Sequence, residues 1–408
     1  MGGPLSGVRV IELSTFVAAP VTARLLADLG ADVIKVETLT GDSWRSSAVN
    51  YLPRFCEEEN PIFDIYNIGK KHVALNLKTP EGKKVFLKLL EQADVFVTNL
   101  RLDALKRLGI FYDDIKDQFP RLVYASVLGY GEKGPDANNQ AYDTVAFWAK
   151  SGFLRDMTTV TDNYYPVTAP IGVGDTATGY LLLAEICAAL FRRTNTGLGD
   201  YVTSTLYHNG IFCMGTMVMM SQPPFGRNFP YNRVDNGPRE GSYKCADGEW
   251  IYFALGNASV NTPKYHALIG HPELDTDPRF VPEKLWLNRY DYYEYFRVAF
   301  LRKTSTEWVE LGKKFDLPIV RLGHFKDVST DEQAWANGYL EHINYPNGHV
   351  DIMPTSPIEM KSATPCPIKP VPANGTHTEE VLRSLGYSEE NIKDLENLGA
   401  IRSNKKDK

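Results

Sequence analysis

Asp175 is a carboxylate whose position in this 408-residue chain could support chemistry. It follows Gly172-Val173-Gly174 and begins an apolar pattern with helical spacing, which predicts a helix over 175–193. The dipole and free N–H groups of a helix N-terminus stabilise an ionised carboxylate, and an ionised aspartate can act as a nucleophile. An aspartate that only caps the helix would occupy the same place. Spacing alone therefore leaves both interpretations open.

Basic and amide side chains lie at predicted strand ends in the first half of the chain. Each of them alone is typical of solvated surface. Gathered at one edge of a sheet, they would suit a ligand that carries several phosphate groups. The residues of this set are Lys70, Lys71, Lys78, Asn99, Arg101 and Arg107.

Several other kinds of site are disfavoured by the residue pattern. The turn after the first predicted strand, residues 14–20, has no GxGxxG motif, so Glu37 is not expected to hold the ribose of a nicotinamide dinucleotide. The cysteines and histidines lack the CxxC, HxxxH and HExxH spacings of metal sites, so we expect no metal. A net charge of −6 and a pI near 5.8 predict that nucleic acid is not a partner.

The elements that would position these residues alternate between strand and helix. One helix is predicted after Pro20 and up to Gly30, where glycine ends the helical spacing of the apolar residues. A second helix is predicted to begin at Thr79-Pro80, because a capping residue there precedes proline at the first helical position. Strand, helix and strand in succession favour a parallel sheet with right-handed crossovers. The predicted strands span residues 8–13, 33–36, 94–98 and 122–127. We therefore predict an α/β fold with ligand sites at the strand ends.

The second half of the chain differs in character. The segment 223–230 is rich in proline, glycine and aromatic residues and is expected to be a linker between two domains. Beyond it, Asp247-Gly248 lies between two strand-like runs and predicts a hairpin. Helices are predicted over 291–301 and 306–314.

No segment is expected to cross a membrane. The apolar stretches 180–191 and 211–220 are shorter than the roughly 20 residues that a bilayer requires. The helix over 175–193 is apolar almost all round, so it is expected to be central and buried. The N-terminus lacks the features of a secretion signal, which favours a cytoplasmic protein.

A series of motifs extends over nearly the whole chain. The motifs are Arg9-Val10-Ile11-Glu12-Leu13, residues 26–37, Gly41-Asp42 with Arg45, Asn67 with Lys70-Lys71, residues 75–78, Ala93-Asp94-Val95 with Asn99, and Gly174-Asp175 with Gly179, Arg192, Thr196-Gly197 and Gly199. Through them the chain resembles the family III CoA-transferases, the relatives of formyl-CoA transferase and carnitine CoA-transferase. Residues 129–136, 331–340 and 345–348 look most like the subgroup that acts on phenyllactate and 2-hydroxyisocaproate in amino-acid fermentation.

The resemblance implies an enzyme that moves CoA from an acyl-CoA to a carboxylic acid, here a 2-hydroxy acid, with no cofactor beyond CoA as substrate and no metal. Asp175 matches the family's nucleophile, which forms an aspartyl anhydride and then an aspartyl-CoA thioester. The implied fold is a homodimer of two interlocked rings. Its large Rossmann-like domain is expected over 1–222, a smaller α+β domain over 223–330, and a C-terminal part that returns to the large domain over 331–408.

The resemblance also implies which residues contact the substrates. The positions that match CoA contacts are Val17, Ala18, Thr38, Leu75, Lys78, Asn99, Arg101, Arg107, Gln140, Tyr142 and Leu206. A substrate-facing loop is implied at Gly256, Asn257 and Ala258, where formyl-CoA transferase has glycines. That enzyme also has histidine, glutamine, arginine and lysine where this chain has Thr15, Val17, Thr38 and Gln140, so individual adenine and phosphate contacts are expected to differ.

Two alternative functions are weaker. The α-methylacyl-CoA racemases resemble the same family but use a histidine at the position of Tyr142, and a tyrosine with a pKa near 10 is a poor general base at neutral pH. A noncatalytic CoA-binding protein would retain Arg101 and Arg107 but would give no reason for an aspartate at 175. CoA transfer is therefore the favoured function.

Overall fold

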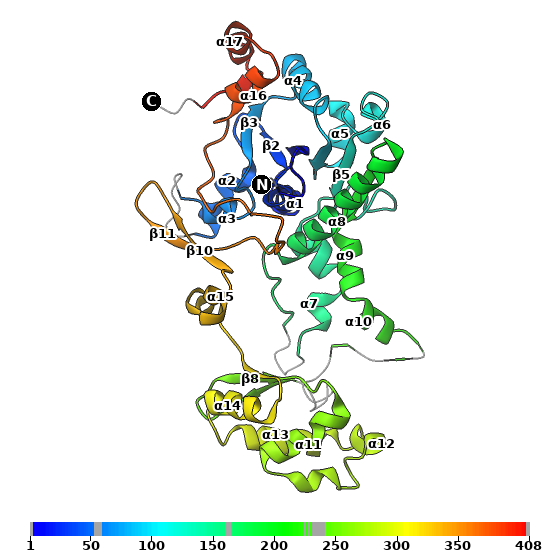
Figure 1. Ribbon diagram of the computed structural model, residues 1–408. Helices are drawn as coiled ribbons and strands as arrows, with labels where there is room; N and C mark the ends of the chain where they lie inside the picture. Colours follow the sequence, from blue (N-terminus) through cyan, green and yellow to red (C-terminus); the bar gives the residue numbers. More distant parts are fainter. Residues whose placement is uncertain are drawn as a thin grey trace. The chain divides into compact units, whose positions relative to one another are not determined.

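The computed structural model describes residues 3–52, 59–159, 165–223, 225–226, 229–230 and 241–404 (Figure 1). Part of the expected linker over 223–230 lies outside these residues. The chain divides into two compact units. The first combines Met1–Gly152, Ala169–Val218 and Glu332–Lys408, and the second combines Phe153–Thr168 and Met219–Asp331.

A seven-stranded sheet with the order β12-β3-β2-β1-β4-β5-β6 forms the centre of the first unit. Its strands are β1 (Arg9–Leu13), β2 (Asp32–Glu37), β3 (Lys71–Leu75), β4 (Val95–Thr98), β5 (Val123–Leu128), β6 (Tyr201–Thr205) and β12 (Ile401–Arg402). All neighbours are parallel except β12, which runs antiparallel to β3. The predicted α/β fold is confirmed. The strand order reverses between β1 and β4, and ligands in such sheets bind outside the carboxyl ends of the strands at this point.

Helices cover both faces of the sheet, which is why apolar strand residues are buried on both sides of it. On one face, α1 (Ala18–Asp28) and α8 (Val173–Thr196) pack on strand residues that include Val10. The other face, which includes Ile11, is covered by α4 (Pro80–Leu90), α5 (Leu102–Leu108), α6 (Tyr112–Ile115), α16 (Thr378–Ser384) and α17 (Glu389–Asn397). The sheet therefore lies between two helical layers (Figure 1).

The local signals for α4 act as the sequence predicts. The hydroxyl of Thr79 accepts a hydrogen bond from the backbone N–H of Gly82 at 3.1 Å, and Pro80 occupies the first helical position. The cap satisfies one of the N–H groups that a helix leaves free, and proline lacks such a group. Both residues therefore start the helix at the end of the segment that follows β3.

Helix α8 corrects the expectation of a helix that is buried all round. Only one face is buried, against α1, β5 and β6, whereas Tyr180, Leu181 and Phe191 on the other are exposed. By length and composition alone, its 24 residues would suffice to cross a membrane, a test that the core helix of a soluble protein also passes, so the expectation that no segment crosses a membrane stays a prediction. Its contacts are those of a helix packed on a sheet, and its sequence includes Asp175 and Glu185.

Shorter elements complete the first unit. They are α2 (Ser43–Ser47), a 3₁₀ turn (Ala48–Asn50), α3 (Pro61–Asp64), a π-helical turn (Thr144–Ala149), α9 (Leu206–Cys213), the start of α10 (Gly215–Met220), α15 (Glu332–Ala336), and the antiparallel pair β10 (Leu340–Asn344) and β11 (Val350–Pro354). The π-helical turn follows Tyr142-Asp143, and such turns are frequent at functional sites.

The second unit has its own core, built largely from aromatic side chains. The predicted hairpin at Asp247-Gly248 is confirmed: it joins β7 (Gly241–Lys244) to β8 (Trp250–Phe253), and β9 (Ile319–Arg321) completes an antiparallel sheet. The other elements are α7 (Phe153–Asp156), α11 (Ala258–Ile269), a 3₁₀ turn (Pro272–Asp275), α12 (Pro282–Leu285), α13 (Arg289–Phe300), α14 (Ser305–Phe315) and a second 3₁₀ turn (Phe325–Thr330).

Candidate active site

A pocket of about 250 Å³ lies in the first unit at the carboxyl ends of β1, β4 and β5. It includes the point where the strand order reverses, which is the expected place for a ligand. Eight of the residues predicted for the site line it: Val17, Ala18, Asn99, Arg101, Gln140, Tyr142, Asp175 and Leu206. The fold therefore brings together residues that are up to 189 positions apart, from Val17 to Leu206.

Two further hollows extend this pocket along the sheet edge. The second shares Thr15 and Leu100 with the pocket and is lined by the predicted residues Thr38, Leu75 and Lys78. The third shares Leu77, Lys78 and Leu108 with the second and is lined by Arg107. Neighbouring hollows share lining residues, so the three lie side by side between Asp175 and Arg107, and together they are called the groove below.

Asp175 does not cap α8. The N-cap is Gly172, which has a left-handed backbone with φ 74°, and Asp175 is the third residue of the helix. Burial, and after it the charge of Asp143, raises the pKa of Asp175 to about 7. Desolvation thus opposes the expected stabilisation of the ionised carboxylate at the helix N-terminus, because burial disfavours the charged form.

Asp143 is a second buried carboxyl group beside the pocket, with 5% of its surface exposed. A Cβ atom on Gly174 would lie 2.3 Å from Asp143 Oδ1 and 2.4 Å from the ring of Phe147, so only glycine permits this approach. Burial raises the pKa of Asp143 to about 6. Paired carboxyl groups with raised pKa values are typical of functional sites.

Some predicted residues lie elsewhere. Lys70 is fully buried and pairs with Glu12 at 2.7 Å, and Lys71 pairs with Asp32 at 3.3 Å at the start of β2, so neither belongs to the groove. Gly256, Asn257 and Ala258 belong to the second unit, where they precede and begin α11, and their role as a substrate loop stays a prediction. Thus the basic set does not converge as a whole.

Three residues near the groove were missed from the sequence. Asp143, which directly follows Tyr142 in the sequence, was not predicted for the site. Lys83 lines the third hollow with Lys78 and Arg107, and its position five residues after Lys78 in a predicted helix was the available signal. Tyr66 was not singled out, and burial together with the charge of Asp175 raises its pKa.

In the part of the chain that the structure describes, no group of three or more His, Cys, Asp or Glu side chains is arranged to hold a metal ion. The absence of a metal from the reaction stays a prediction.

Proteins of named activity are similar to this chain over nearly its whole length. Among curated proteins, the (R)-2-hydroxy-4-methylpentanoate CoA-transferase of Clostridioides difficile is 37% identical, with 98% of this chain and 99% of the relative covered. The cinnamoyl-CoA:phenyllactate CoA-transferase of Clostridium sporogenes is 36% identical, with 96% of this chain and 95% of the relative covered. These alignments include both units described above.

Solved structures share the fold. The crystal structure of Rv3272 from M. tuberculosis matches with a TM-score of 0.79 at 26% identity, covering 93% of this chain and 98% of that one. A CAIB/BAIF family protein from Brucella suis matches with a TM-score of 0.78 at 26% identity, covering 94% and 100%. Residues 5–378 match the family model for CoA-transferase family III. The chain belongs to this family and is a CoA-transferase.

Proposed function

We propose that this CoA-transferase moves CoA from an acyl-CoA to a 2-hydroxy acid through covalent intermediates on Asp175. The observation that carries the mechanism is the groove, which has the Asp175 carboxyl group at one end and the cations Lys78 and Arg107 at the other. The names of the two relatives at 36% and 37% identity support the acid class, since both act on 2-hydroxy acids.

The proposed reaction exchanges acyl groups without water. The ionised Asp175 carboxylate attacks the thioester carbonyl of the donor, which forms a mixed anhydride and releases CoA thiolate. The thiolate attacks the Asp175 carbonyl, which forms an aspartyl-CoA thioester and releases the donor acid. The acceptor carboxylate then attacks this thioester, and the released thiolate takes the acyl group from the second anhydride. Each step forms one acyl bond and breaks one, so the thioester energy is retained.

CoA would extend along the groove with its thiol near Asp175 and its phosphates near Lys78, Lys83 and Arg107. Within the described residues, none of these three cations forms an ion pair with a carboxylate, so all are available to phosphate oxygens. The net charge of −6 opposes long-range attraction of an anion, so binding depends on this local cluster. The remaining predicted contacts, among them Thr38, Leu75 and Asn99, line the hollows between Asp175 and these three cations.

Asp143 is expected to influence the pH at which the rate with the donor acyl-CoA begins to fall. Because the pKa of Asp175 is about 7, kcat/KM is expected to fall as the pH drops below 7 and the carboxylate is protonated. Asp143→Asn removes a neighbouring negative charge, so the pKa of Asp175 falls and the acid limb moves to lower pH. Initial rates from pH 5 to 9 measure the shift, and an unmoved limb would show that Asp143 does not act on Asp175.

A panel of acids tests the proposed substrate. The enzyme is incubated with cinnamoyl-CoA, isocaproyl-CoA or succinyl-CoA as donor and with phenyllactate, 2-hydroxyisocaproate, oxalate or glutarate as acceptor, and new acyl-CoA is separated by chromatography. We expect the 2-hydroxy acids to be the preferred acceptors. Exclusive use of oxalate or of a dicarboxylic acid would refute the assignment while leaving the family membership intact.

The exposed face of α8 supports the proposed homodimer. Phe191 is 73% exposed and Tyr180 44% exposed on a helix whose opposite face is in the core. Large apolar side chains gathered on one face mark a surface for another protein. Light scattering of the purified protein measures its oligomeric state, and a monomer at micromolar concentration would refute the proposed dimer.

A further inference from the structure

Phe16, in the wall of the pocket that contains Asp175, has a strained backbone. Its φ is 63°, which places a residue with a bulky side chain in the left-handed region. Such a conformation costs free energy and persists only where surrounding contacts hold it. The residue lies between the end of β1 and the start of α1, so its conformation sets the direction in which residues 15–18 enter the pocket wall.

Hydrogen bonds from two directions hold this turn. The backbone N–H of Thr15 donates to Asn99 Oδ1 at 3.0 Å, and Asn99 Nδ2 donates to the carbonyl of Thr15 at 2.7 Å. The backbone N–H of Phe16 donates to Asp42 Oδ1 at 3.3 Å. The ring of Phe16 then lies 5.6 Å from the rings of both Trp44 and Tyr142, measured between centroids.

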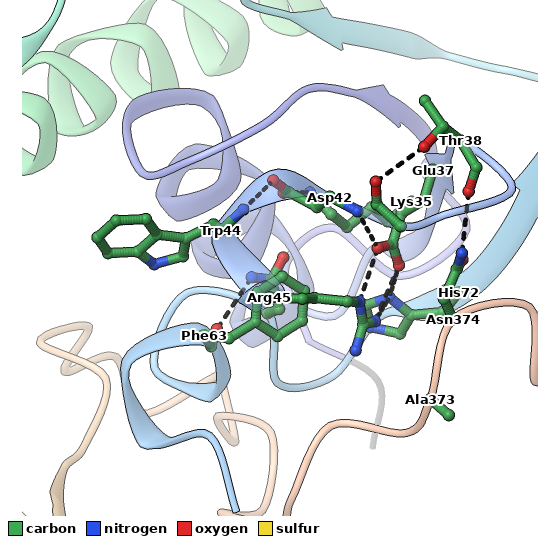
Figure 2. Close-up of polar contacts among 12 residues, drawn as sticks. Lys35, Glu37, Thr38, Asp42, Trp44, Arg45, Phe63, His72, Ala373 and Asn374 are labelled. Atoms are coloured by element: carbon green, nitrogen blue, oxygen red, sulfur yellow. Dashed lines mark hydrogen bonds and ion pairs between the residues drawn. The ribbon is translucent and has the colours of Figure 1, made fainter. Parts of the chain in front are cut away.

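Asp42 is itself held in place by several groups. Its Oδ1 also accepts from the backbone N–H of Trp44 at 2.9 Å, and its own N–H donates to Glu37 Oε2 at 2.9 Å (Figure 2). Its Oδ2 lies 3.0 Å from the ammonium group of Lys35, and neither side chain is exposed. Lys35 pairs in addition with Glu12 at 2.7 Å. Buried charges are costly unless they are paired in good geometry, so this network defines the position of Asp42 closely.

The same network ties the surrounding loop to the C-terminal part of the chain. Arg45 contacts both oxygens of Glu37, at 2.7 and 2.9 Å, and donates to the carbonyl of Pro372 at 3.1 Å. Asn374 donates to the carbonyl of Thr38 at 2.9 Å (Figure 2). Residues 38–42, which line the second hollow, are thus held from both sides.

We infer that Asp42 is a positioning residue for CoA transfer: by accepting from the N–H of Phe16, it holds the left-handed turn that shapes the pocket wall around Asp175. This inference rests on the proposed function of that pocket. The competing explanation is that Asp42 only neutralises the buried Lys35. The two explanations differ in which atom of Asp42 matters, since Oδ1 holds the turn and Oδ2 faces Lys35.

Substitutions at position 42 separate these explanations. Asparagine keeps an oxygen that can accept from Phe16 but removes the charge, whereas alanine removes both. We expect Asp42→Ala to lower kcat/KM for the acyl-CoA donor by about tenfold or more per folded enzyme, because small misplacements in an active site are costly. Asp42→Asn should restore most of that loss while still lowering the melting temperature. If Asn is as damaging as Ala, or if Ala leaves kcat/KM unchanged, the inference is wrong.

Asp28→Ala is the matched control. Asp28 is equally buried, pairs with Arg24 at 2.9 Å and accepts from the N–H of Cys366, but it is at the opposite end of α1 from the pocket. The Asp28→Ala variant should have a lower melting temperature but an unchanged kcat/KM per folded enzyme. A loss of kcat/KM like that expected for Asp42→Ala would overturn the inference.

A second pair of variants keeps the inference testable if Asp42→Ala does not fold. Glycine adopts a φ of 63° without strain, so Phe16→Gly should be more stable than Phe16→Ala, the reverse of the usual order. A more stable alanine variant would mean that the turn is not left-handed.

If wild-type enzyme transfers no CoA to any acid, the proposed function fails by itself. The position-42 variants are then ranked by calorimetric binding of free CoA, and equal affinities would overturn the inference.

Discussion

Replacement of Asp175 by asparagine is expected to lower the rate of CoA transfer by at least about 10⁴-fold, the largest effect of any single substitution in this chain. An amide cannot form the anhydride, because it lacks the nucleophilic carboxylate. CoA binding should change little, since the cations at the far end of the groove are untouched. Initial rates with a saturating donor measure the loss, and calorimetry measures the affinity for CoA.

Trapping experiments give an independent readout of the same residue. Wild-type enzyme incubated with an acyl-CoA and then with hydroxylamine should carry a hydroxamate on the peptide that contains Asp175, detected by mass spectrometry. Glu185→Gln is the matched control, because Glu185 is on the same helix and burial raises its pKa to about 7 as well. This control should remain active and still be trapped. A fully active Asp175→Asn enzyme, with its mass verified, would refute the covalent mechanism.

The second large effect is expected from Arg107→Ala. Arg107 lines the third hollow and has no carboxylate partner in the described part of the chain. Charge-assisted contacts to phosphate contribute about 1.5 to 3 kcal/mol, so its loss should weaken CoA binding by roughly ten- to a hundredfold. We expect the KM of every acyl-CoA donor to rise, with a much smaller change in the KM of the acceptor acid. Steady-state kinetics with each substrate varied in turn measures the difference.

Lys106→Ala is the control for this prediction. Lys106 is the neighbouring residue on α5, but its ammonium group lies over the ring of Phe111, 5.2 Å from the centroid, instead of lining the hollow. The Lys106→Ala variant should leave the KM of the donor unchanged, whereas Lys83→Ala should raise this KM, as Arg107→Ala does. Equal KM changes for donor and acid, or none for either, would show that Arg107 does not bind the CoA moiety.

The strand and helix pattern of both units follows from local sequence. Thr79 and Pro80 predict the start of α4 because capping and a missing N–H group are properties of a few adjacent residues. The hairpin at Asp247-Gly248 follows for the same reason. The helix that includes Asp175 was likewise predictable, to within two residues at its start, from apolar spacing and nearby glycines.

Tertiary structure decided the properties that depend on residues distant in the chain. The pKa of Asp175 rises because folding buries its carboxyl group and brings Asp143, 32 positions away, close to it. Lys70 was predicted for the ligand site but pairs with Glu12 in the interior, since a basic residue at a strand end looks the same in sequence whether it is buried or free. The strain at Phe16 is equally invisible, because it exists only while Asp42 and Asn99 hold the turn. Local propensity therefore determined the elements, whereas burial and distant charges determined the chemistry that the site can perform.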